Sequence, residues 1–206
     1  MGLPTTNSPL NCKLCLMRWF ICLLICSPLA VHGGEWHVDK KAEGNQVEFT
    51  SKVVALTFTG TTDKIDGFIY WEGDSLFAVK DQLHFEVDLA SFDTGIGKRD
   101  RDMRQVLDTD QWPKAVYKGE IAEHTEVDST VVAYGVKTKG ILSLHGVDRA
   151  VEVPGTVVVE EGRSKVEAAF TIKLADYNIE APSLAAFVKV SQEIAIEVSF
   201  YLKHVQ

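Results

Sequence analysis

The chain is poor in the residues and motifs that carry covalent cross-links or catalysis. All four of its cysteines lie between residues 12 and 26, so the rest of the sequence can form no disulfide and no cysteine-based metal site. It also has no Gly-rich phosphate loop, no Gly-x-Ser-x-Gly elbow and no zinc-protease helix. We therefore expect a protein that is not an enzyme and that gains its stability from a hydrophobic core.

The chain also lacks an excess of positive charge. Its net charge is −8, and removal of residues 1–33 would change it to −10, because Lys13 and Arg18 are the only charged residues before Glu35. So acidic a domain repels the phosphates of nucleic acids and anionic membrane surfaces. We therefore expect no nucleic-acid partner.

The N-terminal stretch is predicted to be a signal peptide. The two basic residues precede an apolar run over residues 19–31, and small residues follow up to Gly33, where cleavage is expected. The alternative is a membrane anchor, but this run is shorter than the roughly 20 residues of a spanning helix and contains Pro28. We expect a cleaved leader over residues 1–33 and one exported domain over residues 34–206, periplasmic or secreted and without an integral membrane segment.

Alternating apolar and polar residues, by contrast, are abundant. Residues 82–90 read QLHFEVDLA, which places every apolar side chain on one face of a strand and every charged one on the other. Similar segments follow one another, separated by turn residues, with no internal repeat and no linker between them. The expected strands are residues 36–40, 46–59, 65–71, 79–92, 115–123, 130–144, 150–160, 165–175 and 192–203.

So many long strands in one domain predict an all-β fold, either a sandwich or a closed antiparallel barrel of about eight strands. Closure is favoured because it leaves no exposed edge strand. Two other segments stand out: residues 98–107 are expected to form a short helix, and residues 182–187 a lid or a turn of helix. A barrel of this size is either filled by its own side chains or holds one slender ligand.

Three polar patterns allow more than one interpretation. Asp93-Thr94-Gly95 matches the tripeptide of aspartic proteases, but a single copy would need a homodimer, and a turn after a strand explains it as well. His84 and Glu86 share one strand face, but no third ligand follows at a motif spacing, so we expect no metal site. Arg99 and Asp100 belong either to a solvated helix or to a buried hydrogen-bonded pair that fixes the loop at the barrel mouth.

Two blocks of sequence carry a resemblance. The first block follows the strand at residues 82–90 and contains Phe92-Asp93-Thr94-Gly95, then Arg99-Asp100, then Asp110-Gln111-Trp112-Pro113. The second block is residues 140–151, which read GILSLHGVDRAV. Their order resembles that of the YceI-like family of exported lipid-binding proteins, and the resemblance covers essentially all of residues 34–206. The chain departs from the family pattern at residues 142–145, where LSLH replaces hydrophobic-Thr-Ile-Lys.

The resemblance implies an extended, antiparallel, eight-stranded, lipocalin-like barrel in the periplasm, with one short helix in a loop. It implies a non-catalytic protein whose partner is a long apolar small molecule, a polyisoprenoid such as a quinone or an isoprenyl phosphate, with no other cofactor. Association with a second copy, as a homodimer, is left open. The residues expected to contact such a ligand are Phe49, Phe58, Phe68, Phe85, Phe92, Phe170, Ile172 and Phe187 in the walls and Met103, Leu107 and Trp112 in a lid. Those expected to shape the loop are Asp93, Gly95, Arg99 and Asp100.

The same apolar side chains could instead fill the interior. A packed barrel and a lined tunnel demand the same residue types, so the sequence does not distinguish them. The alternative to a lipid carrier is therefore a filled barrel that acts as a stress-related protein-interaction module through the face formed by residues 98–112.

Overall fold

The computed structural model describes residues 2, 33–53, 56–73, 77, 81–128, 132–181, 183–185 and 188–205. The chain divides into two units, residues 1–30 and 31–206, and all the described residues except Gly2 belong to the second unit. The expected signal peptide lies outside the described residues, apart from Gly2 and Gly33. Gly33 is the first residue of the first strand.

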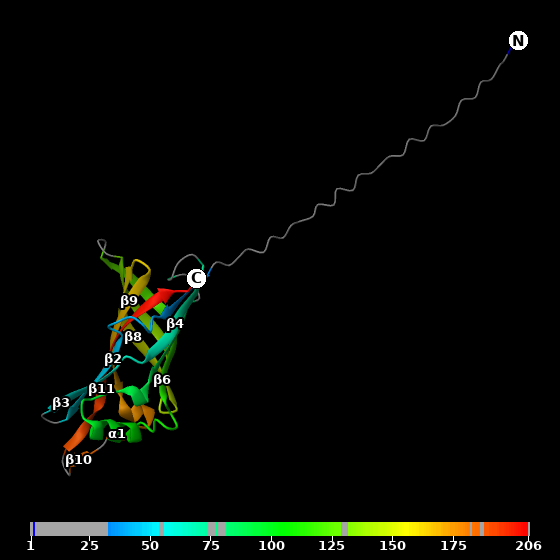
Figure 1. Ribbon diagram of the computed structural model, residues 1–206. Helices are drawn as coiled ribbons and strands as arrows, with labels where there is room; N and C mark the ends of the chain where they lie inside the picture. The colour runs from blue at the N-terminus through cyan, green and yellow to red at the C-terminus, as the bar shows by residue number, and fades with distance from the viewer. Residues whose placement is uncertain are drawn as a thin grey trace. The chain divides into compact units, whose positions relative to one another are not determined.

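Strands make up most of the described part of the chain, together with one α-helix and two short 3₁₀ helices (Figure 1). The strands are β1 (Gly33–Val38), β2 (Gln46–Val53), β3 (Leu56–Thr62), β4 (Ile65–Glu72), β5 (Asp81–Asp88), β6 (Lys114–Asp128), β7 (Ala133–Leu144), β8 (Val147–Glu160), β9 (Arg163–Lys173), β10 (Ser183–Ala185) and β11 (Val188–His204). The helices are η1 (Leu89–Ser91), α1 (Gly97–Val106) and η2 (Leu174–Tyr177). Among the described residues, no helix has the length and apolar character needed to cross a membrane.

Eight strands close into an antiparallel barrel, in the order β1-β4-β5-β6-β7-β8-β9-β11. The last strand returns to the first, with Trp36 opposite His204 and Val38 opposite Leu202. Only the end of β11 meets β1; residues 190–199 of β11 pair with β2 instead, and β2 pairs with β3. The predicted all-β barrel with one short helix is confirmed, with the β2–β3 hairpin added to its wall.

The alternation that predicted the strands also sets what faces inward. Burial and the lining of the interior assign the inner face to the apolar positions of two strands. On β5 and η1 these are Leu83, Phe85, Val87 and Leu89, and on β11 they are Ile194, Ile196, Val198, Phe200 and Leu202. The alternation noted in residues 82–90 therefore does separate an inner from an outer face, and the same alternation in residues 194–202 has the same outcome.

Two expectations about the strands were wrong. Residues 46–59 are not one strand but parts of β2 and β3, which pair antiparallel from Val47 opposite Thr62 to Val53 opposite Leu56. Residues 182–187 were expected to form a lid or a helical turn; residues 183–185 form a strand, β10, that pairs with the start of β11, so the helical turn is wrong and the lid stays a prediction. The remaining three positions of that segment, Phe187 included, lie outside the described residues.

The two ends of the barrel are built differently. Figure 1 shows α1 and β10 at one end and the tops of β4 and β9 at the other. At the end away from α1, Trp36 meets Trp71 edge to face with ring centroids 5.5 Å apart, and Leu202 has no exposed surface. Toward α1, the ladder between β8 and β9 stops after Gly155 and Ala168, so residues 147–154 and 169–173 lie outside it. The wall therefore widens toward the helix.

Candidate functional site

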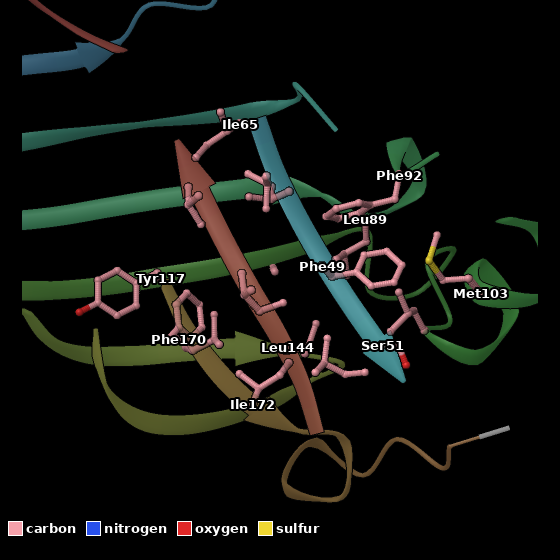
Figure 2. Close-up of a pocket in the computed structure, with 18 of the residues that line it drawn as sticks. Phe49, Ser51, Ile65, Leu89, Phe92, Met103, Tyr117, Leu144, Phe170 and Ile172 are labelled. Atoms are coloured by element: carbon pink, nitrogen blue, oxygen red, sulfur yellow. The ribbon is translucent and has the colours of Figure 1, made fainter. Parts of the chain in front are cut away.

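The half of the barrel next to α1 encloses a cavity of about 1150 Å³. Side chains from β2 to β9 and from β11 line it, and α1 lies across its end. Figure 2 shows Phe49 on β2, Phe170 on β9 and Met103 on α1 among the side chains directed into it. A volume of this order reaches the upper end of pockets that enclose a small ligand. A filled interior, the alternative left open by the sequence, does not describe this half of the barrel.

Most of the residues predicted to contact a ligand do line the cavity. These are Phe49, Phe58, Phe85, Phe92, Met103, Leu107, Phe170 and Ile172. Three of them form an aromatic cluster, because the ring of Phe49 lies 5.3 Å from that of Phe92 and 6.2 Å from that of Phe58, both edge to face. Edge-to-face contacts add to the stabilisation from burial alone. That these residues contact a ligand stays a prediction.

Phe68 is misplaced in the prediction: it lies on the opposite face of β4. The inward positions of β4 are Ile65, Gly67, Ile69 and Trp71, which are buried, whereas the positions between them are only partly buried. The ring of Phe68 stacks on the outside between His37, at 5.8 Å, and His84, at 5.5 Å. An aromatic residue in a half-buried strand is thus no proof of an inward direction.

Trp112 is also absent from the cavity wall, and its side chain is 37% exposed. Its ring covers Gly146 in the turn between β7 and β8, where an added Cβ would come within 2.6 Å of the ring. Gly146 has φ +71°, a conformation that glycine adopts without strain. Trp112 therefore braces a turn and is not part of a lid.

The loop before α1 is held by both residues of the Arg99-Asp100 pair. Asp100 accepts hydrogen bonds from the Thr94 backbone N, at 2.9 Å, and from Thr94 Oγ1, while Arg99 donates to the Thr94 carbonyl oxygen. The bonds from Thr94 hold the pKa of Asp100 below its ordinary value. The two residues thus fix the loop, as one interpretation expected, and they do so through Thr94, for which the sequence indicated a place in a turn.

Asp93 and Gly95 complete this loop as a turn. Gly95 donates its backbone N–H to the Asp93 carboxylate at 2.7 Å and has φ +77°. Asp93 and Thr61 of β3 exchange two backbone hydrogen bonds of 2.9 Å. The Asp93-Thr94-Gly95 tripeptide therefore ties the segment before α1 to the β2–β3 hairpin, which is the role expected of a turn.

The cavity reaches solvent between α1 and the β2–β3 hairpin. Five of the six exposed residues of the described lining lie there: Thr57 on β3, and Ile96, Lys98, Asp102 and Gln105 on and before α1; the sixth, Glu167, lies on β9. Lys98 and Asp102 form an ion pair of 2.8 Å along the helix. Deeper in the cavity, Tyr117 and Thr138 supply polar groups, and burial raises the pKa of Tyr117. The mouth is thus polar and the interior predominantly apolar.

The comparisons with known proteins agree with this architecture. The sequence profile of the YceI-like domain matches residues 36–202. The chain belongs to the YceI-like family. A comparison with curated proteins finds no match.

Three solved structures share the fold. BcnA of Burkholderia cenocepacia is 22% identical, with a TM-score of 0.64 over 80% of this chain and 98% of that one. A polyisoprenoid binding domain from Saccharophagus degradans is 20% identical, with a TM-score of 0.64 over 82% of this chain and 98% of that one. The YceI protein of Campylobacter jejuni is 14% identical, with a TM-score of 0.52 over 71% and 84%. At these identities the likeness shows the fold, and it confirms the lipocalin-like barrel.

Proposed function

We propose that this YceI-like protein holds a polyisoprenoid or a similar long-chain lipid inside its barrel. The observation that carries the proposal is the apolar cavity of about 1150 Å³. An isoprenoid tail presents only methyl and methylene surface, and removing such surface from water contributes about 25 cal/mol per Å². A site for it needs apolar walls of the right width and no catalytic group.

The length of the cavity suits an extended tail. Along β11 alone, lining residues run from Val190 to Phe200, a stretch of strand that spans about 33 Å. A compact ligand would leave much of so long a lumen unfilled. The fold shared with the polyisoprenoid binding domain from Saccharophagus degradans supports the same ligand class.

The proposal includes an exported, non-catalytic carrier or sink. The predicted signal peptide over residues 1–33 and the family's implied periplasmic location support export. The charged residues of the described lining, Lys98, Arg99, Asp102 and Glu167, are exposed or lie beside α1 and do not form a paired acid and base deep in the lumen. The protein's work is then to keep an apolar molecule out of water.

Two neighbouring alanines of β9 provide the test. Ala168 lines the cavity, whereas Ala169 is exposed on the outer face. We expect Ala168→Phe to narrow the lumen and to reduce lipid binding at least about tenfold, since overpacking of a filled site costs about 1–3 kcal/mol. Ala169→Phe, the matched control, should bind as the wild type does.

The measurement is mass spectrometry of solvent extracts of the purified protein, before and after incubation with a prenylated quinone and with an isoprenyl phosphate. Wild-type protein should carry or take up one of them. An extract free of lipid, together with no uptake of either compound, would contradict the proposed function.

A further inference from the structure

The barrel wall is interrupted between β8 and β9. These strands form a hairpin, but their ladder ends where Gly155 stands opposite Ala168. Among the described strand pairs, residues 147–154 of β8 pair with β7 alone, and residues 169–173 of β9 pair with β11 alone. Both strands therefore continue past the break, each with one free edge that faces the other, in the half of the barrel next to α1.

Pro154, the residue of β8 that follows the break, explains why the ladder stops. In an antiparallel ladder, pairs that exchange backbone hydrogen bonds alternate with pairs that do not. Glu160 and Arg163 flank a two-residue turn and form an exchanging pair, so every second pair from there does the same. By this count Pro154 would have to donate to Ala169, and counting from the β7–β8 turn gives the same direction. Proline has no N–H to donate, and in sheets it is confined to edges.

Glu167 indicates that the cavity extends to this break. Its side chain is 52% exposed and bonds to Lys165 on the outer face of β9, yet the residue also lines the cavity. Across the ladder, Gly155 has no side chain to cover the place, and a Cβ added there would lie 2.6 Å from the Glu167 carbonyl oxygen. A residue whose side chain points outward borders an interior cavity where the wall is interrupted.

The inner rim of the gap is apolar. Val153 on β8 and Phe170 and Ile172 on β9 line the cavity beside it, and Figure 2 shows the last two among the side chains directed inward. The free backbone groups of both edges lie in the plane of the sheet, where they meet solvent and can hydrogen-bond to water. The gap thus offers hydrocarbon-like side chains to whatever passes toward the interior.

The 3₁₀ helix η2 limits the gap at its other end. Arg149 on β8 donates from Nε to the Asp176 carbonyl oxygen at 2.7 Å. His145 Nδ1, in the turn before β8, lies 3.1 Å from the carbonyl oxygen of Tyr177, a residue only 2% exposed. Because η2 directly follows β9, these two contacts strap the end of β9 to the β7–β8 hairpin.

We infer that Pro154 keeps this gap open as a second passage, through which the tail of the bound lipid enters and leaves the cavity sideways. The mouth beside α1 admits a chain from its end, whereas a gap along two strands admits a length of chain at once, and η2 sets how wide it opens. The inference rests on the proposed function, since it assumes that a long apolar chain occupies the cavity. A passage changes the rates of binding and release and leaves Kd unchanged, because the free and bound states are the same by either route.

The first test restores the missing donor. Pro154→Val returns an N–H opposite Ala169, so the ladder should extend past Gly155. Because the added hydrogen bonds must break before the tail passes, binding and release of a prenylated quinone should both slow about three- to tenfold, with Kd unchanged. Stopped-flow quenching of tryptophan fluorescence by the quinone measures the rates. Amide hydrogen exchange at residues 150–154 and 169–172 measures the extension of the ladder.

Thr156→Val is the matched control for this substitution. Thr156 is exposed on the same face of β8 and stands opposite Glu167 inside the existing ladder. The variant therefore gains the same side chain two residues away without any change in pairing. Both rates should equal those of the wild type.

The second test loosens the strap. Arg149→Ala removes the hydrogen bond to Asp176, so the gap should open more often and both rates should rise about three- to tenfold at an unchanged Kd. Arg163→Ala is the control, because it removes an Nε bond of the same length, 2.7 Å to the Glu160 carboxylate, at the turn end of the β8–β9 hairpin. It should change neither rate.

The outcomes separate this inference from the proposed function. If the wild type takes up no lipid, the proposed function itself fails. If Pro154→Val extends the ladder and still exchanges quinone at the wild-type rate, the lipid uses the mouth alone and the inference is overturned. If the ladder does not extend, Arg149→Ala decides, and wild-type rates in that variant overturn the inference. A change in Kd that matches the change in release rate would overturn it as well, because it would show contact with the bound ligand and not control of a passage.

Discussion

The packed and the hollow ends of the barrel share strands, alternation and residue types, yet one is solid and the other is not. At the packed end, Leu202 of β11 is fully buried and Trp36 meets Trp71. At the hollow end, Ile196 of the same strand lines the cavity and is only partly buried. The difference does not lie in the inward residues of β11 themselves. It lies in how closely the other strands of the barrel approach these residues.

Strand pairing explains that difference. At the packed end, β1 bridges β4 and β11, which draws the walls together around Trp36 and Val38. At the hollow end, the β2–β3 hairpin takes the place of β1 beside β11, and β8 and β9 leave their common ladder. A longer perimeter encloses a wider interior. The chain thus obtains stability from one end and a binding cavity from the other.

The largest effect expected from this contrast comes from a pair of truncations on β11. Leu202→Ala should lower the free energy of unfolding by about 2–5 kcal/mol, because it opens a void among packed neighbours. Ile196→Ala should cost less, about 1–2 kcal/mol, because part of its side chain already faces the cavity. Chemical denaturation of both variants without ligand measures the difference. Equal losses would mean that the two ends are packed alike.

Alternation in the sequence predicted which side chains of β11 face inward, but it held no information on whether they meet a neighbour or a void. Leu202 and Ile196 have the same apolar character and the same parity in the strand. The pairing of strands far apart in the sequence separates them, since β1 reaches Leu202 and β2 reaches Ile196. The sequence could therefore predict which residues line the cavity, but it could not predict the volume that they enclose.

The two misassigned places have particular causes. Between β2 and β3 the sequence runs from Lys52 to Leu56 through Val and Ala, without the Asn, Gly or Asp that usually marks a hairpin turn, so one long strand was expected. In β4 both faces carry large apolar side chains, so hydrophobicity alone does not orient Phe68. Phe68 shares its parity with Asp66 and Glu72, and these acidic residues mark the outer face.

The next effect concerns the loop that borders the hollow end. Asp100→Ala removes the acceptor for the Thr94 backbone N and hydroxyl, so the segment before α1 should loosen. We expect amide hydrogen exchange at residues 94–107 and release of bound lipid to become about tenfold faster, with the packed end unchanged. Asp102→Ala, which removes only an exposed ion pair with Lys98, is the control for the loop and should leave the exchange rates unchanged.

The direction of the pKa shift of Asp100 determines how the stability of that loop depends on pH. Hydrogen bonds from Thr94 lower the pKa of Asp100 from its ordinary 3.8, so its contribution to stability is present above that pH and is lost as the pH falls through the lower folded-state value. Wild type and Asp100→Ala should therefore differ at neutral pH and converge in strong acid. A difference in exchange rates that stays constant at all pH values would show that the Asp100 carboxylate plays no part.

The smallest effect belongs to the packed end, where Asp81 stands opposite Trp71 in the β4–β5 ladder. Burial raises the pKa of Asp81, the charge of Glu120 adds to the rise, and the hydrogen bond from the Ile121 backbone N opposes it. Because the folded-state pKa is the higher one, the favourable contribution of Asp81 is present below pH 3.8 and is lost as the pH rises through the folded-state value. At neutral pH the ionised group therefore destabilises the fold.

Asp81→Asn keeps an oxygen that accepts from Ile121 and removes the charge, so it should raise the melting temperature at pH 7 by about 1–2 °C. The gain should shrink as the pH approaches 3.8 and the wild-type carboxyl becomes neutral itself. Asp63→Asn serves as the control: this carboxylate is 67% exposed, and its pKa is lowered by Lys64, so its replacement should bring no gain. If Asp81→Asn melted at or below the wild-type temperature at pH 7, the ionised Asp81 would not destabilise the packed end. The packed end and the exposed mouth of the hollow end would then not differ in how they accommodate a charge.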